Sequence, residues 1–128
     1  MICAVATRLS LAPTELDLEI YAGDGAAVAI TVVDANNNIQ NLTGSTIIAQ
    51  VRQNRYDPGT ALLSFAIDTT KYAQGIVTIS LTGAQTATLV TGTNDPWRGF
   101  WDVQWTASGQ QPVTLMQGSL LVDPDVSH

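Results

Sequence analysis

The sequence predicts an all-β fold, an antiparallel β-sandwich of about seven strands with one short helical turn. Three observations lead to this prediction. Apolar and polar residues alternate along several short segments, which is typical of strands that bury one face. Turn sequences separate these segments at intervals of about ten residues, the spacing found in β-sandwiches. Only one stretch of the chain has helical character.

The clearest signal is a β-hairpin formed by residues 98–106 and 113–122. In its first strand Trp101, Val103 and Trp105 alternate with polar residues. A period of two places one face of a strand in the core and the other toward water. We therefore expect Trp101 and Trp105 to be core residues.

Five earlier segments show the same alternation and are predicted to be strands. Their inward residues are expected to be Leu16, Leu18 and Ile20; Val28, Ile30 and Val32; Ile47, Ala49 and Val51; Leu63, Phe65 and Ile67; and Val77, Ile79 and Leu81. Turns rich in Gly, Asn, Asp and Pro are predicted between them. These turns lie at residues 23–25, 34–38, 41–44, 56–59 and 74–75.

The helical stretch is residues 82–89. Thr82 is a suitable N-cap, and Gln85 stands three residues later, as in a capping box. We expect one or two helical turns here.

Residues 1–14 have no clear period and reach Pro13, which favours an extended segment. We expect an N-terminal arm at 1–14 and a sandwich domain at 15–128. Ile2, Val5, Leu9 and Leu11 make the arm apolar, so it is a candidate for pairing with a neighbouring subunit. The alternative is that the arm folds back onto the edge of its own sandwich.

The amino-acid composition excludes several classes of function. The chain has 128 residues, a net charge of −6 and only five Lys and Arg, which form no run. Nucleic-acid binding needs a basic surface, so we expect none. No apolar run approaches the ~20 residues of a membrane span, and no export signal is recognisable. We therefore expect synthesis in a cytoplasm. Charged residues are 12% of the chain, about half the usual share, which fits a subunit packed against others.

Catalytic and metal-binding residues are sparse. The single histidine is His128, and Cys3 is the only cysteine, so neither a nucleophile with its base nor a cysteine-based metal cluster is expected. Asp123 and Asp125 could contribute to a Ca²⁺ site, but the remaining oxygen ligands are not visible. We expect no enzyme activity, no cofactor and no metal.

Four aromatic residues are predicted at turns or on the polar side of strands: Tyr56, Tyr72, Trp97 and Phe100. Aromatic side chains supply contact area at low entropic cost, which suits a protein interface or a sugar-stacking platform. The alternative is that they cap the ends of the sandwich.

Several segments in order resemble a known family. They are residues 16–24, 41–45, 75–87, 101–105 and 115–126. Together they are similar to the small immunoglobulin-like β-sandwich virion proteins of tailed bacteriophages, and to the N-terminal domain of upper baseplate proteins. The resemblance spans residues 15–127 and rests on strand and turn signatures.

This resemblance implies an immunoglobulin-like sandwich and a structural role in a virion, at the tail tip or baseplate or as head decoration. It implies contacts with other virion proteins, in a homo-oligomer or symmetric assembly, and transfers no catalytic residues. A carbohydrate-binding module that uses the exposed aromatic residues is the alternative function.

Overall fold

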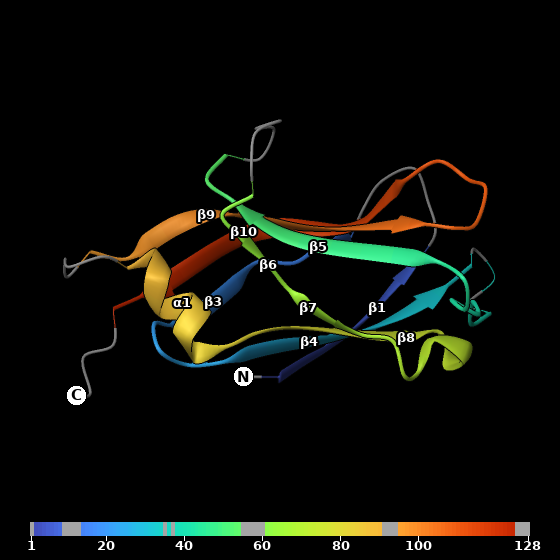
Figure 1. Ribbon diagram of the computed structural model, residues 1–128, viewed down its shortest axis with the longest axis horizontal. Helices are drawn as coiled ribbons and strands as arrows, with labels where there is room; N and C mark the ends of the chain where they lie inside the picture. The colour runs from blue at the N-terminus through green and yellow to red at the C-terminus, as the bar shows by residue number, and fades with distance from the viewer. Residues whose placement is uncertain are drawn as a thin grey trace.

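Two β-sheets pack face to face and form a sandwich, as the computed structural model shows in Figure 1. The structure describes residues 2–8, 14–34, 36, 38–54, 61–90 and 95–124, and for residues 2–8 it describes the backbone alone. The predicted all-β sandwich is confirmed. No helix in these ranges is long and apolar enough to span a membrane.

The smaller sheet has four strands in the order β1-β4-β8-β7. These are β1 (Ile2–Arg8), β4 (Ala26–Val33), β8 (Ile76–Leu81) and β7 (Ala66–Asp68). Neighbours are antiparallel except for β1, which runs parallel to β4. The predicted antiparallel sandwich is thus a mixed one at this edge.

The larger sheet has six strands. They are β2 (Thr14–Glu15), β3 (Leu18–Tyr21), β10 (Val113–Asp123), β9 (Trp97–Thr106), β5 (Thr46–Arg52) and β6 (Leu63–Ser64). The central pairs β10–β9 and β9–β5 are antiparallel, which confirms the predicted terminal hairpin. Both β2 and β3 pair with β10 in parallel.

The strand order is that of an immunoglobulin-like sandwich. In chain order, β4, β5, β7, β8, β9 and β10 take the places of immunoglobulin strands B to G. One sheet then reads B-E-D and the other C-F-G, as that arrangement requires. The helix α1 (Gly83–Leu89) lies in the connection from β8 to β9, where the chain passes between the sheets.

The residues predicted to face inward form one apolar core between the sheets. Its largest fully buried side chains include Trp101, Ile30, Leu42, Ile79, Leu115, Met116 and Leu120. Trp105, also predicted to be a core residue, is partly buried and packs against this cluster. Burial on alternate residues of β4, β5 and β8 explains why the sequence pattern located these strands.

Trp101 is tied to two distant segments. Its indole Nε1 donates a hydrogen bond to the Leu16 carbonyl at 2.9 Å, and its ring lies against Phe65 with centroids 6.0 Å apart. The Leu16 carbonyl approaches Gly118 so closely that a side chain there would overlap it. Only a residue without a side chain fits at this position of β10, because the backbone between β2 and β3 passes directly beside it.

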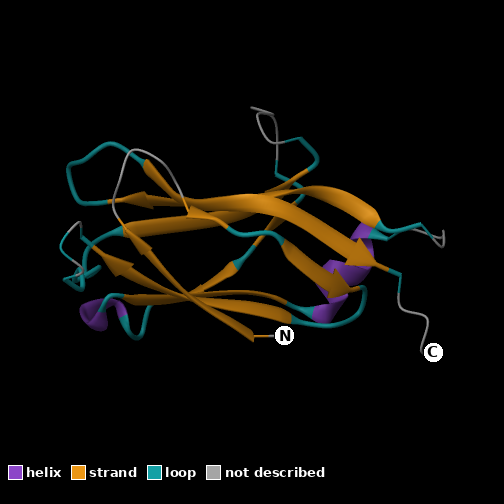
Figure 2. Cartoon of the chain, turned by 180° about the vertical axis from the view of Figure 1, so that it is seen from behind, coloured by secondary structure: helices purple, strands orange, loops and turns teal. Residues whose placement is uncertain are grey.

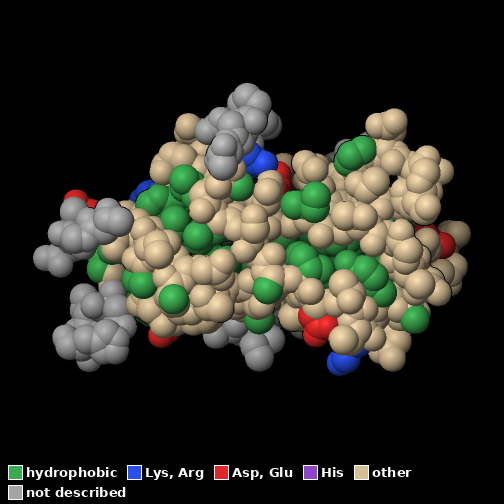
Figure 3. Space-filling model, viewed as in Figure 1, with side chains coloured by type: hydrophobic (Ala, Val, Ile, Leu, Met, Phe, Trp, Pro, Cys, Tyr) green, Lys and Arg blue, Asp and Glu red, His purple; other side chains and the backbone are tan. Residues whose placement is uncertain are grey.

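The predicted strand at 63–67 is two strands in different sheets. Residues 63–64 form β6 and pair with β5, whereas residues 66–68 form β7 and pair with β8. Phe65 lies at the crossing, where its N–H donates to the Ala49 carbonyl at 2.9 Å. Figure 3 shows hydrophobic side chains along the middle of the side of the sandwich where this crossing lies.

Local polar contacts confirm the predicted turn that begins at Asp34 and the predicted helix cap. The Asp34 carboxylate accepts hydrogen bonds from the N–H groups of Asn36 and Asn38. These bonds hold the pKa of Asp34 below its ordinary value. Thr82 and Gln85 form the expected reciprocal capping box at the start of α1. The turn predicted at 56–59 lies outside the described residues.

The expectation of a separate N-terminal arm is corrected for residues 2–8. They form β1, whose backbone pairs along its whole length with β4 of the same chain, from Ile2 opposite Ala27 to Arg8 opposite Val33. The physical reason is that the edge of β4 offers hydrogen-bond partners to the backbone N–H and C=O groups of β1. Folding of this segment onto its own sandwich was the alternative stated in the sequence analysis.

We predict that Trp101→Ala lowers the free energy of unfolding by about 3–5 kcal/mol, because it removes a large buried ring. Asp102→Ala, on the opposite face of β9, is the matched control and should cost far less. Denaturant titration of both variants tests this. A Trp101→Ala protein as stable as the wild type, beside a destabilised Asp102→Ala protein, would show that the face of β9 is inverted.

Candidate interaction surfaces

The candidate interface residues do not form one patch. Ile2 and Val5 lie in β1, for which the structure describes the backbone alone. Leu9, Leu11 and Tyr56 lie outside the described residues. Tyr72, Trp97 and Phe100 occupy three different environments, taken in turn below.

Tyr72 lies in a turn and is buried, in keeping with the alternative that it caps an end of the sandwich. It begins the 3₁₀ helix η1 (Tyr72–Gln74), and its carbonyl accepts a hydrogen bond from the Leu42 N–H at 2.8 Å. Burial also raises the pKa of its phenol. The turn residue Gly75 has φ +75°, so the chain reverses after η1 in a conformation that favours glycine. Tyr72 thus closes one end of the core.

Trp97 and Phe100 do not make a common aromatic platform. The Trp97 ring lies over Gly99 and packs against the core, so it belongs to the inward face of β9. Phe100 lies on the outward face, with Arg52 and Asp102. Residues separated by an odd number of positions point to opposite faces of a strand. The sugar-stacking pair that the sequence allowed is therefore not formed by these two rings.

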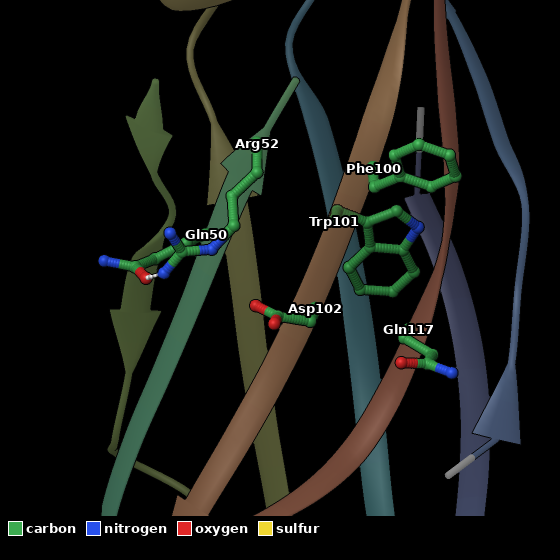
Figure 4. Close-up of a pocket in the computed structure, with 6 residues that line it drawn as sticks. All are labelled: Gln50, Arg52, Phe100, Trp101, Asp102 and Gln117. Atoms are coloured by element: carbon green, nitrogen blue, oxygen red, sulfur yellow. Dashed lines mark hydrogen bonds between the residues drawn. The ribbon is translucent and has the colours of Figure 1, made fainter. Parts of the chain in front are cut away.

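The outward face of the large sheet carries a polar cluster that the sequence analysis did not identify. Gln50, Asp102 and Gln117 stand in register on β5, β9 and β10. Figure 4 shows these side chains together with Arg52, whose Nη2 donates to Gln50 Oε1 at 2.6 Å. The sequence does show that these residues are the polar positions that alternate with inward-facing apolar ones. It does not show which strands are neighbours, and only strand pairing brings the three side chains together.

Asp102 is half-buried in the middle of this cluster. Burial raises the pKa of its carboxyl, and the nearby Arg52 guanidinium opposes that shift. Beside the cluster, a hollow of about 230 Å³ lies between β9 and β10. Its lining combines apolar and charged groups: Arg98, Gly99, Phe100, Ser119, Leu120 and Leu121. Such a surface suits contact with another protein.

Two carboxyl groups meet at the margin of the same sheet. Glu19 on β3 and Asp123 on β10 are linked by a side-chain hydrogen bond, and this bond and the like charge raise the pKa of Glu19. The positive charge of Arg98 lowers the pKa of Glu19 and so partly offsets this effect. Asp125, the other residue considered for Ca²⁺, lies outside the described residues. Within the described ranges no three His, Cys, Asp or Glu side chains group as metal ligands would.

The four sheet edges differ in length and continuity. β7 has three residues, β6 has two, and β2 and β3 are separated by Leu16 and Asp17. β1 is a continuous strand of seven residues. One side of β1 pairs with β4, and among the described residues no strand pairs with its other side. Figure 2 shows β1 on the side of the sandwich that is turned toward the viewer.

Comparison with known proteins gives no family. No family model matches the chain, and no curated protein sequence matches it. Among solved structures, the N-terminal domain of phage TP901-1 ORF48 has 9% identity and a TM-score of 0.44, covering 97% of this chain and 98% of that one. The cysteine protease inhibitor EhICP2 from Entamoeba histolytica has 8% identity and a TM-score of 0.40, covering 97% of each chain.

A third structure is the inclusion body protein PixA from Burkholderia cenocepacia. It has 11% identity and a TM-score of 0.33, covering 93% of this chain and 82% of that one. With such identities and with TM-scores below 0.5, these similarities support no statement about family or function.

We predict that Asp102→Asn raises the melting temperature at pH 7. The raised pKa means that the folded state holds its proton more tightly than the unfolded state. Stability is therefore greatest below the unfolded pKa and falls as the pH rises through the folded pKa. The gain from Asp102→Asn should disappear near pH 3, where the wild-type carboxyl is protonated in both states. A gain that is equal at both pH values would contradict this assignment.

Proposed function

We propose that this chain is a non-enzymatic structural component of a tailed-phage virion that binds neighbouring subunits through its β-sandwich and the strand β1. The observation that carries the proposal is the seven-residue strand β1, which pairs on one side with β4 and, among the described strands, with no other. An unpaired strand edge offers a row of backbone donors and acceptors to another chain.

The sequence supports the phage assignment. The order of strand and turn signatures over residues 15–127 resembles small virion β-sandwich proteins. Their role is to hold subunits together, at the tail tip or baseplate or on the head. The low content of charged residues, 12%, is consistent with a protein whose surface is largely in contact with neighbouring subunits.

The large sheet supplies a second surface for such contacts. Of the exposed large apolar side chains, Tyr21 and Ile48 lie on strands of this sheet, with 55% and 48% of their surface accessible. Arg98 and Asp102, the centre of the polar cluster, lie on β9, which stands between β3 and β5 in the sheet. Apolar anchors set among charged groups are typical of specific protein interfaces.

The carbohydrate-binding alternative receives no support from a particular observation. It requires aromatic rings that share an exposed face, and Trp97 and Phe100 lie on opposite faces of β9. A glycan array probed with the purified protein is its direct test, and we expect no bound glycan.

We predict that purified phage particles contain the full-length chain in a fixed ratio to the major structural proteins, as measured by quantitative mass spectrometry. A variant without residues 1–8 should be lost from the particles, because the edge strand is gone. A Gln110→Ala variant, in the exposed β9–β10 turn, is the control and should be retained. Particles that never contain the wild-type chain would refute the virion assignment.

The truncation needs one further measurement, because β4 loses its partner strand when residues 1–8 are removed. Its thermal unfolding should remain cooperative at a lower melting temperature. If the truncated chain is folded and is still incorporated, β1 is not the attachment site, and the large sheet is left as the contact surface.

A further inference from the structure

We infer that the outward face of the large sheet binds a neighbouring protein through a lysine and an apolar side chain that stand two positions apart on an extended segment of that protein. The lysine ammonium contacts the Asp102 carboxylate, and the apolar side chain fills the hollow between β9 and β10. This inference rests on the proposed function in one respect, that another protein covers this face.

The Asp102 carboxylate is half-buried, and the hydrogen-bond donors around it are engaged elsewhere. Its neighbours in register are Gln50 on β5 and Gln117 on β10. Arg52 donates to Gln50 Oε1, and the Gln117 amide donates to Glu15 Oε1 at 2.8 Å. Among the six side chains drawn in Figure 4, the bond from Arg52 to Gln50 is the only hydrogen bond. No donor of this cluster therefore satisfies the carboxylate.

The charged form of Asp102 is unfavourable in the free protein. Burial raises the pKa of the carboxyl, and the nearby charge of Arg52 offsets this only in part. A cationic group from outside removes the conflict, because it supplies both the opposite charge and the missing hydrogen bond. Groups that conflict with the stability of a free protein are expected at functional sites.

The charge of the whole face selects a cationic partner. Acidic residues outnumber basic ones at the outward positions of its described strands: Glu15, Glu19, Asp102 and Asp123 against Arg52 and Arg98. The chain as a whole has a net charge of −6, so a second copy and other acidic proteins are repelled. Charge complementarity therefore favours a partner that presents a basic group here.

Two adjacent depressions set the spacing of the partner's side chains. The one beside Asp102 measures about 10 Å³, room for a water-sized group, which an ammonium is and a guanidinium is not. The hollow of about 230 Å³ is lined mostly by apolar groups such as Leu121. Phe100 lines both, two residues from Asp102 and thus roughly 7 Å away along β9. Residues two positions apart on an extended segment have the same spacing and share a face.

Panning a random linear peptide library on the immobilised full-length protein tests the inference. We expect the enriched peptides to carry Lys two positions from Leu, Ile, Val or Phe. Asp102→Asn keeps the shape of the face and should bind a synthetic enriched peptide about tenfold or more weakly, because a hydrogen bond between charged groups is lost. Asp24→Asn makes the same change of charge at an exposed turn residue, so it is the matched control and should bind like the wild type.

Variants of the synthetic peptide test the spacing and do not depend on the folding of a protein variant. Replacing its Lys by Gln should weaken binding as much as Asp102→Asn does. Moving the apolar residue by one position should also weaken binding, because the side chain then lies on the other face of an extended segment. A higher salt concentration should weaken the binding of the original peptide.

The inference is overturned if no peptide is enriched, if the enriched peptides lack lysine, or if Asp102→Asn binds them as the wild type does. The outcome for the proposed function is separate. A chain that enters phage particles but selects no lysine peptide leaves the virion role intact. A chain that selects these peptides but is absent from particles supports the lysine site and refutes the virion role.

Discussion

The indole ring of Trp101 joins three segments that are far apart in the sequence. Its face packs against Phe65 at the point where the chain crosses between the sheets, and its N–H holds the Leu16 carbonyl between β2 and β3. Because the ring is almost fully buried, these contacts are made in an environment where an unpaired N–H would be costly. This one side chain thus contacts both the segment between the first two strands of the large sheet and the crossing from one sheet to the other.

These contacts explain the shape of the large sheet. β2 and β3 could form one longer strand along β10, but the chain between them turns its carbonyl inward to reach Trp101. Gly118 leaves room for that approach, and the Asp17 carboxylate accepts the Ser119 N–H at 3.0 Å beside it. The interruption of this edge is therefore a product of core packing. It also leaves β1 as the long uninterrupted edge of the sandwich.

The sequence was sufficient where structure depends on neighbouring residues. The facing of β4, β5 and β8 follows from their alternation, and the capping box of α1 needs only Thr82 and Gln85. The sequence was insufficient where the structure depends on hydrogen bonds between segments that are far apart along the chain. The division of 63–67 at Phe65 and the pairing of β1 with β4 depend on hydrogen bonds between segments that no local pattern connects. The same holds for the Gln50, Asp102 and Gln117 cluster, which exists only through strand register.

The parallel pairing of β3 with β10 has a mechanical consequence. Residues 18–21 lie beside residues 120–123, so β3 and β10, the last strand of the chain's described part, run in the same direction, side by side. A force applied between the N-terminal end of β3 and the C-terminal end of β10 would slide these strands past each other and load their hydrogen bonds together, in shear. Sequential opening, as in a zipper pulled from one end, is not available in this geometry. The β3–β10 pair therefore resists a load along its strands, and its lifetime under that load is set by the rate of unfolding and not by equilibrium stability.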